Sequence, residues 1–308
     1  MRLLVVIVTY NAMQWAKRCL DSLNSSTFQP DVYIIDNGSY DGTQKFIQDN
    51  YPKYFFYQSK ENIGFGKANN IGLQYALDND YDYVYLLNQD AWVMPDTFEK
   101  LIQISTQYST YGILSPFQMN ADLKHIDKNF LKSSCAWNST PTLLTDLYNG
   151  SEQDVYEVSF VMAAHWLITR KCLLKIGGFS PSFPHYGEDN NYVDRLHYHG
   201  MKIGVVPSLR VVHDRADRIE SPQKRIHIIY TTSIRYLSNP LISVKSSLVQ
   251  IIKANLKGMI NHCSKQMLKN LFLLLIKANE IRRNRRISMK RDCAFLVYKK
   301  YNVITTIR

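Results

Sequence analysis

Residues 3–11 read Leu-Leu-Val-Val-Ile-Val-Thr-Tyr-Asn, a run of six aliphatic residues followed by a polar stretch. A continuous aliphatic run of this length is typical of a β-strand that is buried on both faces, as in a parallel sheet covered by helices. The apolar residues that come next are spaced as one face of a helix: Trp15, Cys19, Leu20 and Leu23. A buried strand followed by an amphipathic helix predicts the beginning of an α/β domain.

The same alternation of short apolar runs and helical patterns continues to about residue 115. We predict further strands at Val32–Ile35, Tyr54–Tyr57 and Tyr83–Leu87, and helices from about Thr43, at Lys67–Asn79 and at Pro95–Tyr108. Strands that alternate with helices indicate a Rossmann-like, mostly parallel central sheet with helices on both faces.

The pattern is weaker in the second half of this domain. Residues 116–155 contain Pro116, Pro141 and many Asn, Ser and Thr residues, so we expect a loop-rich segment there. Beyond it we predict strands at Val158–Met162, Trp166–Thr169, Ile203–Val206 and Leu209–Val212, and a helix at Gly187–His199. The predicted domain covers residues 1–219, with a first half at about 1–115 and a second at about 116–219.

Residues 220–308 have a different charge and pattern from the rest of the chain. The net charge of the whole chain is +11, but residues 1–219 carry −4 and residues 220–308 carry +15. Apolar residues from Leu248 to Leu275 follow a 3.6-residue period, with lysines between them. We therefore predict a basic, amphipathic, helical C-terminal region, which suits an anionic membrane surface. A helical cap that packs on the domain is the alternative.

Other features of the composition exclude several classes of protein. No apolar run approaches the ~18 residues that indicate a membrane-spanning helix, and the first apolar run is too short for a signal peptide. We therefore expect a cytoplasmic protein. The five cysteines are scattered, which argues against a disulfide framework or structural zinc. No nucleic-acid-reading motif accompanies the basic cluster near residue 283, so we expect no nucleic-acid partner.

Polar or glycine-rich residues follow each of the first four predicted strands. Because ligands of open parallel sheets bind at the carboxyl ends of the strands, we expect these residues to share one site. The alternative is that these residues form no binding site and are polar only because loops are exposed to solvent. The four stretches are Thr9-Tyr10-Asn11, Asp36-Asn37-Gly38-Ser39, Asn62 to Lys67, and Asn88-Gln89-Asp90.

The glycine pattern does not fit the common phosphate-binding loops. The first strand is not followed by G-x-G-x-x-G, and the sequence has no Walker-A lysine loop. A phosphate ligand would then need a cation. Asp90 ends a buried strand, and His213 follows the last predicted strand, so the two could hold Mg²⁺ or Mn²⁺. A lone histidine is more often an ordinary core or surface residue.

Gly187-Glu188-Asp189 opens the predicted helix after residue 187. Acidic residues are favourable in a first helical turn for electrostatic reasons alone. Asp189, however, shares a helix face with Val193 and Leu196, so we expect it to point inward, where a carboxylate is a candidate general base. His165, Trp166 and Phe179 could line the same cavity, although ordinary core packing explains Phe179 better.

Taken in order, these motifs resemble those of inverting family-2 glycosyltransferases of the GT-A fold, especially the rhamnosyltransferase-like branch of bacterial surface-polysaccharide biosynthesis. The resemblance covers about residues 3–215. It is carried by Val8 to Asn11, Asp36 to Thr43, Asn62 to Asn70, Leu86 to Ala91, Ile176 to Phe179 and Gly187 to Asp189. One departure is Asn88, which stands where the family's D-x-D element has its first carboxylate.

The resemblance implies a role for each matching position. Asp189 would be the general base, Asp90 and His213 would hold the metal ion, and His165, Trp166 and Glu188 would contact the acceptor or the donor sugar. The nucleotide-sugar donor would be bound by Thr9, Tyr10, Asn11, Asp36, Asn37, Gly64, Lys67, Asn69, Asn88, Gln89 and Asp90.

The function predicted on this basis is transfer of a sugar from a nucleotide-diphosphate sugar, dTDP-rhamnose or a UDP-sugar, to a hydroxyl of a glycan that is itself lipid-linked. A single displacement would invert the anomeric configuration. The enzyme would be peripheral on the cytoplasmic face of the membrane. The alternatives are a non-catalytic nucleotide-sugar-binding scaffold, and a membrane- or nucleic-acid-binding protein whose α/β body is only structural.

Overall fold

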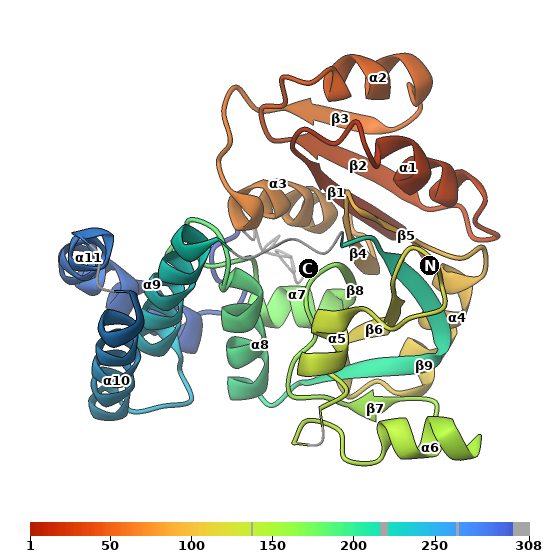
Figure 1. Ribbon diagram of the computed structural model, residues 1–308. Coiled ribbons are helices and arrows are strands. Elements are labelled where there is room, and N and C mark those ends of the chain that lie inside the picture. The colour runs from red at the N-terminus through yellow and green to blue at the C-terminus, as the bar shows by residue number, and fades with distance from the viewer. Residues whose placement is uncertain (137, 216–220, 263–264, 298–308) are drawn as a thin grey trace, which may run out of the picture.

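The computed structural model describes residues 1–136, 138–215, 221–262 and 265–297. Its centre is a nine-stranded sheet in the order β3-β2-β1-β4-β8-β6-β9-β5, with β7 paired to β9 (Figure 1). The strands are β1 (Leu3–Thr9), β2 (Asp31–Asp36), β3 (Phe55–Gln58), β4 (Tyr83–Asn88), β5 (Ala91–Trp92), β6 (Tyr111–Met119), β7 (Tyr156–Glu157), β8 (His165–Thr169) and β9 (Lys202–His213).

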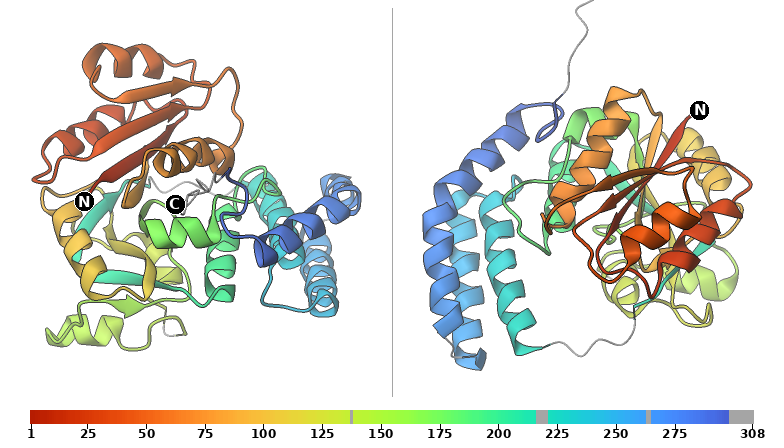
Figure 2. Two further views of the ribbon diagram at one scale, coloured as in Figure 1. Left: turned by 180° about the vertical axis from the view of Figure 1, so that it is seen from behind. Right: turned by 90° about the horizontal axis from the view of Figure 1, so that it is seen from above.

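Helices cover both faces of this sheet, and a group of three stands beside it (Figures 1 and 2). The helices are α1 (Ala16–Asn24), α2 (Thr43–Asn50), α3 (Phe65–Asp78), α4 (Thr97–Gln107), α5 (Lys128–Ser133), α6 (Leu143–Asn149), α7 (Arg170–Ile176), α8 (Glu188–Tyr198), α9 (Pro222–Ser238), α10 (Val244–His262) and α11 (Lys265–Lys290). The predicted alternation of strands and helices up to residue 115 is confirmed.

Strand β1 is buried on both faces, as its aliphatic run predicts. Leu4 and Val6 pack into one core cluster, which includes Leu73 of α3. Leu3, Val5 and Ile7 lie in a second cluster on the opposite face, together with residues of α1 and α4. Alternate residues of a strand point to opposite faces, so a run without polar residues fills two cores at once.

The sheet is parallel in its first half and mixed in its second. Strand β1 pairs in parallel with β2 and β4, and β2 pairs in parallel with β3. Strand β8 runs antiparallel to both β4 and β6, whereas β6 and β9 are parallel. The carboxyl ends of β1, β2, β3 and β4 therefore meet at one edge.

Three features of the second half differ from the prediction. Strand β6 continues through Pro116, which stands beyond the residues paired to β8 and at a register shift against β9, where a missing N–H is tolerated. The two strands predicted after residue 202 form the single strand β9. Val158–Met162 is not a strand: its apolar residues pack irregularly in the core, a case that periodicity cannot distinguish.

The C-terminal helices pack against the α/β body rather than trailing from it. Phe183, from the loop before α8, lies in an apolar cluster with residues of α9, α10 and α11. After α11, the backbone N–H of Cys293 donates to Leu174 O, and the carbonyl of Ala294 accepts from the N–H of Gly178. The predicted boundary after residue 219 lies outside the described residues. Within the described part of the chain, no helix is long and apolar enough to cross a membrane.

Candidate active site

A cleft of about 920 Å³, here called the strand-end cleft, lies at the carboxyl edge of the parallel strands. It brings together seven of the predicted donor-binding residues, which come from four separate strand ends: Tyr10, Asn37, Gly64, Lys67, Asn88, Gln89 and Asp90. The opposite wall is made by the loop Pro181–His185 and by Lys277 of α11. The expected convergence of the strand-end loops is therefore present in the structure.

Hydrogen bonds between the loops fix the shape of this cleft. The side chain of Gln89 accepts from the backbone N–H of Tyr10 at 2.6 Å and donates to the carbonyl of Tyr10 at 3.2 Å. The side chain of Asn37 donates to Asn62 and accepts from the backbone N–H of Ile63. These hydrogen bonds join the end of β1 to the end of β4, and the end of β2 to the loop after β3.

Asp36 is completely buried at the end of β2, and its carboxylate is saturated by protein donors. Oδ1 accepts from the hydroxyls of Thr9 and Ser39, and Oδ2 accepts from the Ser39 N–H and the Gln44 amide, all at 2.6–2.9 Å. In this structure Asp36 organises the loops that carry Tyr10 and Asn37 and does not line the cleft itself.

Asp90, which lines the strand-end cleft, forms a polar cluster with Arg215 and with His213, which is buried and does not itself line the cleft. His213 Nε2 lies 3.5 Å from Asp90 Oδ1, and Arg215 Nε donates to the same His213 nitrogen at 3.2 Å. His213 Nδ1 faces Gln118 Oε1 at 3.3 Å. Burial opposes ionisation of Asp90, but its contact with His213 and the charge of Arg215 outweigh burial, so the pKa of Asp90 is lowered.

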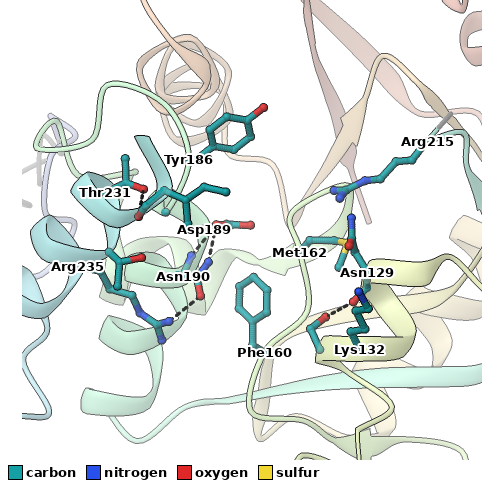
Figure 3. Close-up of a pocket in the computed structure, with 14 residues that line it drawn as sticks. Asn129, Lys132, Phe160, Met162, Tyr186, Asp189, Asn190, Arg215, Thr231 and Arg235 are labelled. Carbon is teal, nitrogen blue, oxygen red and sulfur yellow. Dashed lines mark hydrogen bonds between the residues drawn. The ribbon is translucent and has the colours of Figure 1, made fainter. Parts of the chain in front are cut away.

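A second cavity of about 420 Å³, here called the α8 cavity, surrounds Asp189 (Figure 3). Asp189 is half-buried in the first turn of α8, and its carboxylate points into the cavity. The other walls come from three parts of the chain: Lys132 of α5 with Phe160 and Met162, Arg215 after β9, and residues of α9 that include Thr231 and Arg235.

The surroundings of Asp189 favour a proton acceptor that titrates above its ordinary range. Burial raises the pKa of Asp189, while hydrogen bonds from Asn190 and the positive charges of Arg215 and Arg235 offset part of that rise. Arg215 lowers the pKa of Asp90 as well. One guanidinium therefore acts electrostatically on both acidic groups, although they line different cavities.

Glu188, the residue before Asp189, is 5% exposed. Its Oε2 has no hydrogen-bond partner among the described residues. Burial, and then the charge of Asp189, raise the pKa of Glu188 to about 8. Glu188 is therefore largely protonated at neutral pH, and its side chain lies beside Gly66 at the start of α3. It lines neither cavity directly.

His165 and Trp166 are core residues in this structure. Both are fully buried in β8. The two ring nitrogens of His165 lie within 2.9 Å of the Tyr85 hydroxyl and the Val212 carbonyl, and burial lowers the pKa of His165 to about 3. The Trp166 indole donates to Val161 O and packs on Phe179. Neither side chain reaches solvent in this structure, and their predicted contact with the acceptor or the donor sugar stays a prediction.

Three other predicted donor contacts are also absent from the lining of the strand-end cleft. Thr9 and Asn69 are buried, with Thr9 bonded to Asp36 and Asn69 to the carbonyl of Phe65. Asn11, with a φ of 51°, uses its amide oxygen to accept from the N–H of Tyr40. These residues shape the loops, and their predicted contact with a donor stays a prediction.

Sequence reasoning missed the basic residues Lys132, Arg215, Arg235 and Lys277. Arg215 stands two positions after the predicted ligand His213, which was a usable signal. Arg235 and Lys277 belong to the basic C-terminal region, where a general charge excess hid their separate positions. Only the packing of α9 and α11 on the body brings them to the two cavities.

Comparison with known proteins decides the family. The sequence profile of glycosyl transferase family 2 matches residues 4–170, more than half of the chain. The chain belongs to glycosyl transferase family 2. This family-2 protein is accordingly a glycosyltransferase, as the resemblance of its motifs predicted.

The relatives of this family-2 protein include two rhamnosyltransferases. The N-acetylglucosaminyl-diphospho-decaprenol L-rhamnosyltransferase of Mycobacterium tuberculosis is 26% identical over 232 residues, which cover 69% of this chain and 76% of that protein. The rhamnosyltransferase WbbL of Escherichia coli K12 is 24% identical over 225 residues, which cover 68% of this chain and 82% of that protein. The prediction of a rhamnosyltransferase-like member is confirmed.

Solved structures confirm the GT-A fold. The mannosyltransferase PcManGT of Pyrobaculum calidifontis, in complex with GDP-Man and Mn²⁺, superposes with a TM-score of 0.58 at 17% identity. The match covers 91% of this chain and 75% of that chain, so the likeness extends beyond the residues matched by the family profile.

Proposed function

We propose that this glycosyltransferase moves a sugar from a nucleotide-diphosphate sugar, dTDP-rhamnose or a UDP-sugar, to a hydroxyl of a lipid-linked glycan. Two relatives are rhamnosyltransferases, and the name of one specifies a diphospho-decaprenol acceptor. The strand-end cleft would hold the nucleotide diphosphate. The adjoining α8 cavity would hold the acceptor hydroxyl.

The single observation that carries the proposal is the position of Asp189. Its carboxylate points into a cavity that is lined by two arginines. Burial raises the pKa of this carboxylate, and a general base requires such a raised pKa. A sugar hydroxyl is a weak nucleophile, so Asp189 would accept its proton as the oxygen attacks the anomeric carbon. The bond to the diphosphate breaks in the same step, which inverts the configuration and needs no covalent enzyme intermediate.

The charge of the departing diphosphate would be met by basic groups of this chain and by a divalent metal ion. Lys67 and Lys277 line the strand-end cleft, and Arg215 lies beside Asp90 and His213. The metal ion, when bound, would supply Lewis-acid stabilisation of the leaving group. The remaining work of orienting the donor falls to the loops of the cleft.

Asp90 and His213 fit a metal ion of the Mn²⁺ or Mg²⁺ type. The Gln118 oxygen can only accept a hydrogen bond, so His213 carries its proton on Nδ1 and has its lone pair on Nε2, which lies 3.5 Å from Asp90 Oδ1. Arg215 Nε donates to this lone pair in the structure, so a metal ion would take the place of that hydrogen bond. The described residues contain no cluster of three or more metal-ligating side chains. The donor's phosphate oxygens and water would therefore complete the coordination, as is usual for Mg²⁺ at phosphate sites.

A panel of nucleotide sugars tests this function. Thermal unfolding of the protein is followed with dTDP-rhamnose, UDP-GlcNAc, UDP-glucose and GDP-mannose, each with and without Mn²⁺, because a bound donor stabilises the folded state by mass action. The stabilising donor is then incubated with a short-chain polyprenyl-diphospho-N-acetylglucosamine, and the anomeric configuration of the product is read by NMR. An inverted product supports the proposal. Binding of a donor without transfer or hydrolysis would favour the scaffold instead.

We further propose that the enzyme is peripheral on the cytoplasmic face of the membrane, held by the outer face of α11. Leu268, Phe272, Leu275 and Ile276 are exposed at i, i+4, i+7 and i+8, while Met267, Leu274 and Ile281 are buried on the other side of this helix. Residues 244–290 contain eleven Lys and Arg and only one acidic residue. An apolar stripe flanked by basic side chains is complementary to an anionic bilayer surface.

Sedimentation with lipid vesicles tests this membrane contact in the full chain. The double variant Phe272→Ser, Leu275→Ser should bind phosphatidylglycerol-containing vesicles at least about tenfold more weakly than wild type, because two apolar anchors are lost. Tyr148→Ser removes an exposed aromatic side chain on α6 and serves as the control. Equal binding of the double variant and wild type to these vesicles would contradict the proposal. Equal binding of wild type to vesicles with and without phosphatidylglycerol would contradict it as well.

A further inference from the structure

Arg235 of α9 connects the C-terminal helices to the first turn of α8. Its Nε and Nη2 donate to the two carboxylate oxygens of Asp194, both at 2.8 Å, and its Nη1 donates to Asn190 Oδ1 at 2.8 Å. Asn190 in turn donates twice to Asp189 Oδ1, from its backbone N–H at 2.8 Å and from its side-chain amide at 3.1 Å (Figure 3). The contacts form one continuous path from α9 to Asp189.

We propose that Arg235 is a positioning residue for Asp189, and that α9 is therefore part of the catalytic unit although it lies outside the residues matched by the family profile. The proposal rests on the role of Asp189 as general base given above. It assigns to the C-terminal region a function in the transfer reaction that is separate from any contact with a membrane.

The direction of the hydrogen bonds explains why Arg235 matters to Asp189. The side-chain amide of an asparagine can flip, which exchanges its oxygen and nitrogen, unless a hydrogen bond fixes one of these atoms. Arg235 can only donate, so it fixes the oxygen of Asn190 on the α9 side and turns the Asn190 nitrogen towards Asp189. Both donors of Asn190 reach Oδ1, which orients the carboxylate and leaves Oδ2 to accept the proton of the acceptor hydroxyl.

The docking of α9 does not depend on Arg235 alone. The side chain of Asn191 donates to Ser238 at 3.1 Å, and Tyr230, Ile234 and Leu237 are buried in the apolar cluster shared with Phe183. Removal of the guanidinium should therefore leave α9 in place. A merely structural tether and a positioning residue can be separated by experiment for this reason.

Arg235 also contributes a positive charge near Asp189. The other charged groups around Asp189 are Glu188 on its own helix, Arg215 after β9 and Lys132 of α5. Arg235 and Arg215 both lower the pKa of Asp189. Loss of one of these two cations should move the acidic limb of the pH–rate profile to higher pH, because a less stabilised carboxylate holds its proton longer.

The test compares Arg235→Gln, Arg235→Lys and Asn190→Ala in the full chain, with dTDP-rhamnose as donor and the polyprenyl-diphospho-N-acetylglucosamine as acceptor. Arg225→Gln removes a charge from an exposed position of the same helix and is the matched control. Asn190→Ala keeps the Arg235–Asp194 ion pair, so it breaks the path without loosening the contact between α8 and α9.

We expect Arg235→Gln to lower kcat about tenfold to a hundredfold, the loss that a small misplacement of a reacting group causes, with the KM for the donor unchanged. Its acidic limb should move to higher pH. Arg235→Lys should keep the limb in place, because the charge remains, yet lose part of kcat, because a lysine is a point donor. Asn190→Ala and Arg235→Gln should not be additive in the double variant, since both break one path.

Two results would overturn the positioning role: an Arg235→Gln variant that transfers within about twofold of wild type, or fully additive losses with no change in the pH profile. If Arg235→Gln does not fold, Asn190→Ala alone decides, because transfer at the wild-type rate in that variant contradicts the proposal. Asp189→Asn separates the two claims. Transfer at close to the wild-type rate by Asp189→Asn would overturn the general-base role of Asp189, on which this proposal rests, whereas an inactive Asp189→Asn beside a normal Arg235→Gln would overturn only the role of Arg235.

Discussion

Replacement of Glu188 by glutamine should change how the stability of the protein depends on pH. Glu188 is 5% exposed, and its pKa is raised from 4.5 to about 8. Because the folded state favours the protonated carboxyl, this group contributes stability that is fully present below about pH 4.5 and is lost as the pH rises through about 8. Glutamine is neutral throughout and removes this dependence.

The size of the effect follows from the two pKa values. Each unit by which a folded-state pKa exceeds the unfolded value corresponds to about 1.4 kcal/mol, so the rise from 4.5 to about 8 sets an upper bound on the order of 4–5 kcal/mol. Relaxation and water entry reduce such values, so we expect roughly 2–4 kcal/mol. Glu188→Gln should match wild type near pH 5 and exceed it by this amount near pH 9.

Urea unfolding, followed by tryptophan fluorescence at several pH values between 5 and 9, measures this difference. Glu152→Gln makes the same substitution at an exposed glutamate and is the matched control. If the stabilities of Glu188→Gln and wild type remained parallel across this range, Glu188 would not be a buried, protonated carboxyl, and the electrostatic description of the first turn of α8 would be wrong.

The remaining predictions concern the proposed metal ligand Asp90 and two glycines, Gly177 and Gly42. Asp90→Asn should weaken donor binding in Mn²⁺ at least about tenfold by calorimetry, because one of two protein ligands loses its charge; unchanged affinity would contradict the assignment. Chelation of divalent ions should abolish most of the donor-induced thermal shift of wild type but little of that of Asp90→Asn, and equal losses would count against a site at Asp90. Gly177→Ala should lower stability by more than about 2 kcal/mol, because Gly177 has a φ of 82° and an added Cβ would clash with the backbone of Ala294, whereas Gly42→Ala, with a φ of 94° and open space around it, should lose only about 1 kcal/mol. Similar losses in both would show that the segment after α11 does not pack on Gly177.

The first half of the fold could be predicted because its strands and helices follow from patterns in short stretches of the sequence. The run Leu3–Val8 has no polar residue and so must fill two cores, and parallel strands bring their carboxyl ends to one edge whatever the details of the loops. From these two facts, the meeting of Tyr10, Asn37, Lys67 and Asp90 in one cleft follows without any knowledge of distances.

The roles of individual polar residues were harder to predict from the sequence. Asp36 and His165 stand at strand ends, as a ligand-binding residue does, yet their polar atoms are used within the protein. A sequence does not show whether a polar group will meet a ligand or a neighbouring loop. The prediction of a strand at Val158–Met162 was wrong for a related reason, since burial alone does not impose a strand.

The part of the site that comes from the C-terminal region was beyond prediction. Arg235 lies 41 positions after Asp194, and their ion pair depends on how α9 docks on α8. Such a contact has no local periodicity. The excess of positive charge in residues 220–308 led to the prediction that this region binds a membrane surface. Two of its basic residues, Arg235 and Lys277, instead line the two cavities, and the charge excess gave no sign of their separate positions.

The most direct test of the account is the rate of sugar transfer by Asp189→Asn at saturating donor. The account predicts a loss of about 10²–10⁴-fold, the usual contribution of a general base, with the donor-induced thermal shift equal to that of wild type. Transfer at close to the wild-type rate, with the same inverted product, would contradict the assignment of Asp189 and with it the proposed mechanism.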